Sequence, residues 1–305
     1  MEPVTRRVTS SKPVILAATD FSETAEAALD WAFELARQQG GSVELIHAIT
    51  VPSSIPGYVP SAENFQEDVN RAAEARLAAA ATAHEGRGVE VATFLEAGTP
   101  SQVILDRAEA ISPLAIVVGT RGLTGLRHLL LGSTAQRVVH DAHCPVLTVH
   151  PGDFGKHRVI RTILVPTDFS PAAELAIATA HRLLAPLEQD ARLILLHAFN
   201  LPVEYTAYGV IPTSLRYLED TGLEAERRLY ESAQALRREG LTVETVSREG
   251  DPAHVIAEEA EKRGADLIAM GTRGLSGLRH LLMGSTAERA VEHAPCPVMT
   301  IRLSG

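Results

Sequence analysis

The sequence predicts an α/β protein built from two tandem, doubly wound domains. Three observations support this prediction. Short apolar runs rich in β-branched residues alternate along the chain with longer segments of helical periodicity. Residues 119–150 and 271–302 are identical at 22 of 32 positions, which indicates a duplication. The chain has 305 residues, and half of it suffices for a separate core.

The first copy shows the alternation clearly. The apolar run 14–18 lies between Pro13 and Asp20 and predicts a buried strand. Ser22 is a suitable helix N-cap, and apolar residues then recur at helical spacing as far as Gly40 and Gly41. We expect further strands at 42–48, 89–95, 114–118 and 146–149, helices at 62–84, 100–110 and 133–140, and a loop at 51–60.

The second copy repeats this order of elements. We expect strands at 162–165, 193–197, 242–247, 267–270 and 298–301, and helices at 171–184, 213–239, 252–263 and 285–292. Such alternation predicts a parallel sheet in each copy, with helices on both faces. The predicted domains are residues 1–150 and 158–305, joined by a polar linker at 151–157 that contains Pro151, Gly152 and Gly155.

Composition narrows the range of partners. The net charge is −10 and there is no long basic run, which argues against nucleic acid or an anionic membrane as the main partner. No apolar run approaches the length of a membrane-spanning helix, so we expect a cytoplasmic protein. Cys144 and Cys296 fit a reducing compartment, and we expect both to be buried, although a regulatory disulfide stays open.

A glycine-rich loop follows the fourth strand of each copy. In the first copy Gly119 and Gly122 are followed, after nine residues, by Gly132, Ser133 and Thr134 at the start of a helix. Glycine permits positive φ and close approach of the backbone to a ligand, and a helix N-terminus favours anions. The loop therefore predicts a phosphate site, and glycines that serve only the turn are the alternative. The second copy has the same spacing at Gly271, Gly274, Gly284, Ser285 and Thr286.

These motifs resemble those of a known family. The spacing G-x2-G-x9-G-[ST], Thr-Asp-Phe-Ser at 19–22 and 167–170, and Cys-Pro-Val at the last strand of each copy resemble the ATP-binding branch of the universal stress protein family. The resemblance covers nearly the whole chain, twice. It implies a sheet of order 3-2-1-4-5 in each domain, ATP with Mg²⁺ as the ligand, and a regulatory or sensing role in stress with little or no hydrolysis.

The resemblance also assigns residues to the nucleotide. Asp20 and Asp168 would hold its nucleoside side, and the backbone at Ala48 and Ala198 would recognise adenine. Arg121 and Arg273 would neutralise phosphates, with solvated loop charge as the alternative. The other assigned residues are Ala18, Val118, Gly119, Gly122, Gly132, Ser133, Thr134, Pro166, Met270, Gly271, Gly274, Gly284, Ser285 and Thr286. Pro166 stands where the first copy has Ala18, so we expect the loop beside it to shift slightly.

Several alternatives remain open at this stage. A slow ATPase or an autophosphorylating switch would place Ser133 or Ser285 near the γ-phosphate, and a scaffold would leave both pockets empty. No obvious general base or pair of carboxylates lies in the loops, and no protein metal site is predicted. His47 and His197 are expected to be packed side chains. The resemblance further implies pairing of the two domains through their last strands, with a homodimer and an unknown regulatory protein as further partners.

Overall fold

The computed structural model describes residues 12–50, 62–120, 131–153, 159–200, 203–206, 209–212, 215–274 and 283–303. The chain divides into two compact units, Met1–Val159 and Ile160–Gly305. Of the predicted linker, Pro151–Asp153 forms a short 3₁₀ helix, η1, that packs against the first helix of the first unit.

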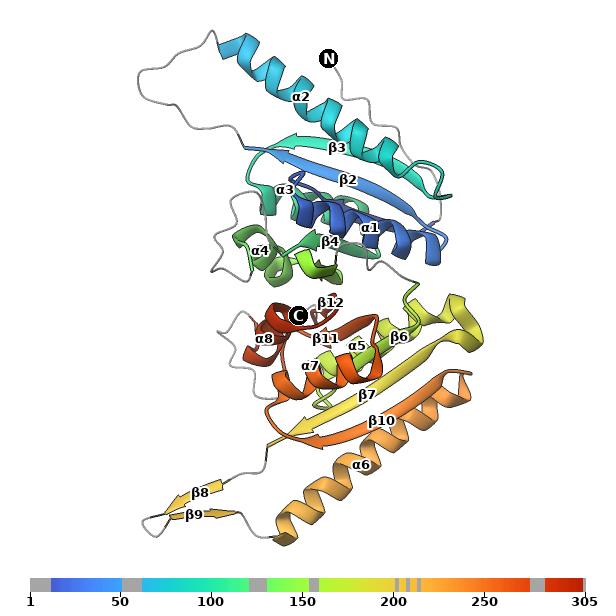
Figure 1. Ribbon diagram of the computed structural model, residues 1–305, viewed down its shortest axis with the longest axis vertical. Coiled ribbons are helices and arrows are strands. Elements are labelled where there is room, and N and C mark those ends of the chain that lie inside the picture. Colours follow the sequence, from blue (N-terminus) through green and yellow to red (C-terminus); the bar gives the residue numbers. More distant parts are fainter. Residues whose placement is uncertain are drawn as a thin grey trace. The chain divides into compact units, whose positions relative to one another are not determined.

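The first unit is a five-stranded parallel sheet of order β3-β2-β1-β4-β5 (Figure 1). This confirms the expected order 3-2-1-4-5. Its strands are β1 (Val14–Ala18), β2 (Ser42–Ile49), β3 (Glu90–Ala97), β4 (Ala115–Gly119) and β5 (Val146–Val149). Its helices are α1 (Glu23–Gln38), α2 (Ala62–Ala83), α3 (Pro100–Ile111) and α4 (Ser133–Asp141). The reversal of strand order between β1 and β4 creates a crevice at their carboxyl ends.

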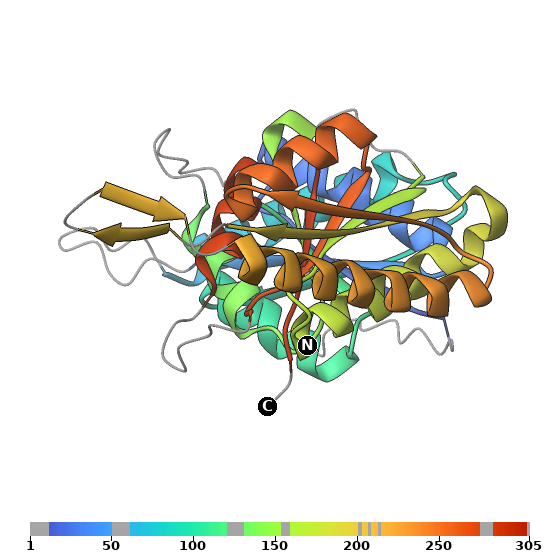
Figure 2. The same ribbon diagram turned by 90° about the horizontal axis from the view of Figure 1, so that it is seen from below.

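The second unit repeats the order as β10-β7-β6-β11-β12. Helices cover both faces of its sheet, and Figure 2 shows α6 and α7 on opposite sides of β7 and β10. The strands are β6 (Thr162–Pro166), β7 (Arg192–Phe199), β10 (Thr242–Glu249), β11 (Leu267–Gly271) and β12 (Val298–Ile301). The helices are α5 (Pro171–Leu184), α6 (Leu215–Arg238), α7 (Pro252–Arg263) and α8 (Ser285–His293), with a 3₁₀ segment η2 (Ala185–Asp190) after α5.

An antiparallel hairpin in the second unit was not predicted from the sequence. It consists of β8 (Val203–Thr206) and β9 (Gly209–Pro212), with Val203 opposite Pro212. Along the chain the hairpin follows β7 and precedes α6, and it forms a separate two-stranded sheet (Figure 1). Strands of four residues are too short to give a clear period-two pattern, which is why the sequence did not reveal them.

The core of the first unit lies where α1 covers the central strands. Ile15 and Leu16 of β1 have no exposed surface, and Phe33 of α1 is 1% exposed. Burial of each such side chain contributes roughly 1.5–3 kcal/mol. This packing holds the end of β1 and the start of α1 in fixed positions, and both lie at the crevice.

Candidate functional site

Each unit has a cavity at the carboxyl ends of its central strands. The cavity of the first unit has a volume of about 560 Å³, and that of the second about 190 Å³. The larger volume lies within the range of roughly 300–1,000 Å³ typical of small-molecule sites. Residues that were assigned from the sequence line the first cavity, namely Ala18, Asp20, Ala48, Val118, Gly119, Gly132, Ser133 and Thr134.

The second cavity is lined by the equivalent residues. They are Pro166, Asp168, Ala198, Met270, Gly271, Arg273, Gly274, Gly284, Ser285 and Thr286. Arg121 and Gly122, which were assigned in the first copy, lie outside the described residues. The structure thus gathers around each cavity all the assigned positions that it describes.

The Thr-Asp-Phe-Ser segment forms a tightly bonded connection from β1 to α1. The Oγ1 atom of Thr19 accepts the N–H of Phe21 at 3.0 Å, and Oδ1 of Asp20 accepts the N–H of Ser22 at 3.0 Å. Ser22 caps α1 by accepting the N–H of Ala25 at 3.2 Å. These bonds fix the backbone on both sides of Asp20 and hold its carboxylate at the cavity.

The second unit repeats these bonds with nearly equal lengths. Thr167 accepts the N–H of Phe169 at 3.0 Å, and Asp168 accepts the N–H of Ser170 at 3.1 Å. The N–H of Thr167 donates to the Leu196 carbonyl at 2.8 Å. The equivalent bond in the first unit, from the N–H of Thr19 to the Ile46 carbonyl, is 2.9 Å long. The segment therefore has the same hydrogen bonds in both units, and the slight shift expected beside Pro166 stays a prediction.

The helices at the back of each cavity begin without a side-chain cap. Gly132 and Gly284 are the N-caps of α4 and α8, and neither can offer a side-chain acceptor. By contrast, Ser22, Ser170 and Asp251 cap α1, α5 and α7. The first N–H groups of α4 and α8 have no acceptor within their own helix, so these termini favour an anionic group.

The glycines do not act as the sequence suggested. Gly132 has φ −69° and Gly284 has φ −71°, and neither Gly119 nor Gly271 is among the described glycines with positive φ. The expectation of positive φ is therefore wrong at these positions. Close approach is the actual requirement at the strand ends, because a Cβ on Gly119 would lie 2.9 Å from the Thr24 methyl carbon. A Cβ on Gly271 would lie 2.7 Å from the Cβ of Ala172.

In the second unit, Asp168 and Gly274 are in close contact. A Cβ on Gly274 would overlap Oδ2 of Asp168, so only glycine lets the carboxylate take this position. Both residues line the second cavity.

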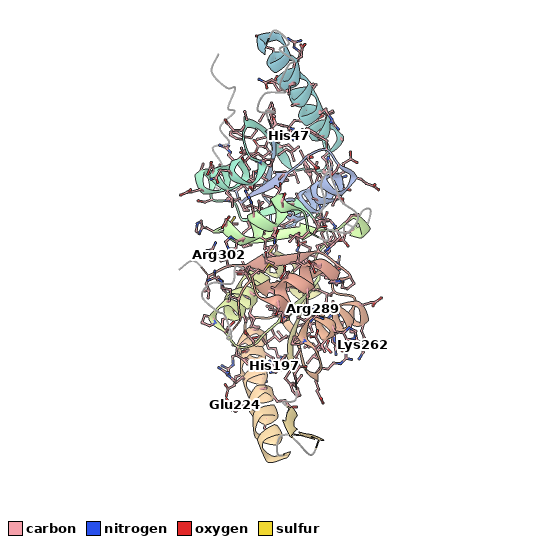
Figure 3. All side chains as sticks on the ribbon, turned by 90° about the vertical axis from the view of Figure 1, so that its left-hand side faces the viewer. His47, His197, Glu224, Lys262, Arg289 and Arg302 are labelled. Carbon is pink, nitrogen blue, oxygen red and sulfur yellow. The ribbon has the colours of Figure 1, made fainter. Side chains whose placement is uncertain are left out.

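Several residues at the cavities were not assigned from the sequence, among them Thr120, Thr272 and His47. Thr120 and Thr272 are 0% and 4% exposed, and their carbonyls accept the N–H groups of Gly132 and Gly284 at 2.7 and 2.9 Å. They tie the loop to the helix N-terminus. His47, labelled in Figure 3, packs at the end of β2 as expected, but it also lines the first cavity. The repeat of Thr and His in both copies was the signal that could have found them.

Other candidate groups lie away from the cavities. Cys296 is buried as expected, but the same expectation is wrong for Cys144, which is only half-buried. Its partial burial raises the pKa of the Cys144 thiol to about 11. Within the described ranges, no group of three or more His, Cys, Asp or Glu side chains is placed to hold a metal ion. None of the described helices is long and apolar enough to cross a membrane.

The fold defines a tandem α/β protein with one cavity at the carboxyl ends of the central strands in each unit. The profile of the universal stress protein family matches residues 13–150 and 160–302, so the chain belongs to this family and contains two copies of its domain. A universal stress protein of Mycolicibacterium smegmatis is 30% identical over 295 residues, which cover 94% of this chain and 96% of that protein.

Other similar proteins include a relative that matches about half of this chain and one whose crystal structure is known. A universal stress protein of Methanocaldococcus jannaschii is 34% identical over 144 residues, covering 47% of this chain and 82% of that protein. The crystal structure of a universal stress protein from Archaeoglobus fulgidus has a TM-score of 0.72 and 21% identity. The alignment covers 96% of this chain and 99% of that one, and it supports the fold.

Proposed function

We propose that this chain binds ATP at two sites, one in each unit, and acts as a regulator or sensor in the stress response with little or no hydrolysis. The observation that carries the proposal is the uncapped N-terminus of α4 and of α8 at the back of a cavity. A phosphate group suits the N–H groups there, and Mg²⁺ would join the phosphates.

The rest of each cavity suits a nucleoside. In the first unit Ile46, Ala48, Ile104 and Val118 offer apolar surface for a base, and Asp20 offers a carboxylate to ribose hydroxyls. Ala48 and Ala198 are small, so the backbone of β2 and β7 is open to the edge of adenine. Arg273 in the second unit would contact the phosphates.

The composition of the described cavity lining supports binding without efficient turnover. The described lining of each cavity contains one carboxylate, Asp20 or Asp168, whereas two-metal hydrolysis uses several. A slow ATPase or autophosphorylating switch is the second candidate, because Ser133 and Ser285 lie at the helix N-termini where the phosphates would bind. A scaffold with empty pockets is the third.

One experiment separates the three candidates. The full chain is purified without added nucleotide, the small molecule that accompanies it is identified by mass spectrometry, and binding of ATP is measured by calorimetry with Mg²⁺. Calorimetry should show two equivalents of ATP bound per chain. Thin-layer analysis after long incubation should show that this ATP is not hydrolysed. Released ADP or a phosphorylated serine would favour the switch. No binding at millimolar ATP would overturn the proposal.

The setting of this function stays a prediction. A cytoplasmic location, pairing through the last strands, a homodimer and a regulatory protein partner are expected from the family resemblance. Sedimentation of the full chain with and without ATP tests the oligomeric state.

A further inference from the structure

We propose that Arg76 and Arg228 are positioning residues that couple α2 and α6 to nucleotide binding through Phe21 and Phe169. The inference rests on the proposed function and adds a physical connection between an occupied nucleotide site and the helices α2 and α6. It concerns a feature that occurs in both units, which we call the Arg–Phe–His stack. It consists of Arg76, Phe21 and His47 in the first unit and Arg228, Phe169 and His197 in the second.

The stack in the first unit joins three elements. The Cζ atom of Arg76 from α2 lies 4.4 Å from the centroid of the Phe21 ring. The imidazole of His47 from β2 also packs on that ring, with centroids 4.4 Å apart and an interplanar angle of 40°. Buried Ala73 and Leu77 anchor this part of α2 on the unit, so the exposed Arg76 reaches Phe21 from a fixed base. Phe21 is therefore held both by His47 of β2 and by Arg76 of α2.

The backbone of Phe21 makes this contact relevant to the cavity. Its φ is +64°, in the left-handed region that is uncommon for a residue with a bulky side chain. Such a conformation costs of order 1–3 kcal/mol and persists only where the surroundings enforce it. Phe21 directly follows Asp20, so a change in its backbone would turn the Asp20 carboxylate away from the position that it holds at the cavity.

The second unit has the same arrangement. Phe169 has φ +62°, Cζ of Arg228 lies 4.6 Å from its ring centroid, and the rings of Phe169 and His197 lie 4.8 Å apart. Arg228 belongs to α6 and is exposed, as Arg76 is. In each unit, an exposed arginine thus contacts the residue with positive φ that follows the predicted nucleotide contact, Asp20 or Asp168.

Linkage makes the inference testable in two directions. If the stack favours the loop conformation that binds ATP, then bound ATP must favour the stack by the same factor. Nucleotide should therefore protect the part of α2 that carries Arg76 against hydrogen exchange. A cation–π contact at an exposed site is worth about 0.5–1 kcal/mol, which corresponds to a change in affinity of about two- to five-fold.

The test uses the full chain with Gly284→Asp, so that only the first site is read. ATP affinity is measured by calorimetry, and hydrogen exchange of α2 is followed with and without ATP. Arg76→Ala should weaken ATP binding about two- to five-fold and reduce the ATP-dependent protection of α2. Arg76→Lys should restore part of both effects. The matched control is Arg71→Ala on the same helix, since Arg71 is exposed and pairs with Asp68 at 3.2 Å; it should change neither readout.

The outcomes separate the inference from the proposed function. If the parent chain binds ATP and Arg76→Ala binds it equally well, the inference is overturned and the proposed function stands. The inference is also overturned if affinity falls but Arg76→Lys does not restore it, or if ATP leaves the exchange of α2 unchanged. If neither the parent nor the chain without substitutions binds ATP, the proposed function itself is wrong.

Discussion

The Nδ1 atom of His47 lies 2.7 Å from the carbonyl oxygen of Thr19, and the same atoms of His197 and Thr167 lie 2.8 Å apart. A carbonyl oxygen only accepts hydrogen bonds, so Nδ1 of each ring carries the proton and donates it. The bond joins the end of β2 to the residue after β1. It therefore fixes the distance between two of the strand ends that form the crevice in each unit.

Replacement of His47 by alanine should destabilise the first unit. His47→Ala removes the donor to the Thr19 carbonyl and one side of the stack on Phe21, which should lower the free energy of unfolding by about 1–2 kcal/mol. Denaturant titration of the full chain measures this change. His254→Ala is the control, because that side chain is 70% exposed, and it should leave the midpoint unchanged. Equal midpoints for both variants would contradict the role of the bond.

The end of β4 requires glycine because of packing. A Cβ on Gly119 would lie 3.1 Å from the backbone of Thr24 in α1, and neither element can move without disturbing the core. Gly119→Ala should therefore cost about 1–3 kcal/mol in unfolding free energy. Gly132→Ala is the matched control, since its Cβ would lie 3.4 Å from the Thr120 carbonyl oxygen, and it should cost less than about 1 kcal/mol. A tolerated Gly119→Ala would show that β4 and α1 can separate.

The two units differ at the end of the third helix. Ser112 is the C-cap of α3 with φ +47°, and Gly264 is the C-cap of α7 with φ +61°. The left-handed conformation penalises a Cβ, so Ser112→Gly should raise the unfolding free energy of the first unit by about 0.5–1 kcal/mol. Gly264→Ser should lower that of the second unit by a similar amount. Thermal unfolding of both variants checks whether the signs are opposite.

An ion-pair cluster in the second unit predicts sensitivity to acid. Burial opposes ionisation of Glu259, but hydrogen bonds from Arg263 and Arg248, at 2.6 and 2.9 Å, lower its pKa from the ordinary value of 4.5. Because the folded-state pKa is lowered, this stabilisation is complete above about pH 4.5 and is lost as the pH falls through the folded-state value.

Glu259→Gln isolates this contribution. The variant should unfold more easily at neutral pH by about 1.5–3 kcal/mol, because hydrogen bonds to an ionised partner are lost. It should also depend less on pH between pH 5 and 3 than the unsubstituted chain. Unfolding midpoints at a series of pH values measure both effects. An unchanged pH dependence would mean that other carboxylates dominate the acid response.

The sequence predicted the order of elements because their apolar patterns are long and occur twice. Thr-Asp-Phe-Ser was placed correctly after the first strand of each copy, and Gly-Ser-Thr at a helix start. Segments that follow parallel strands meet at one edge of the sheet, which is why both motifs line the cavities. The reason for Gly119 was misjudged, because its neighbour Thr24 is 95 residues away in the chain and only the packed fold brings them together. The contact of Arg76 with Phe21 could also not be predicted from the sequence, since it depends on how α2 packs on the sheet.

The phosphate hypothesis is tested most directly at the two glycine N-caps. Aspartate is a good N-cap, so Gly132→Asp should leave the stability of α4 unchanged or slightly higher. Its carboxylate would accept the N–H groups of the first turn and repel a phosphate, so ATP binding in the first unit should be lost. Gly132→Asn offers a similar cap without charge and should weaken binding less. Gly284→Asp should act in the same way in the second unit, and a chain with both aspartates that still binds two equivalents of ATP by calorimetry would show that the phosphates bind elsewhere.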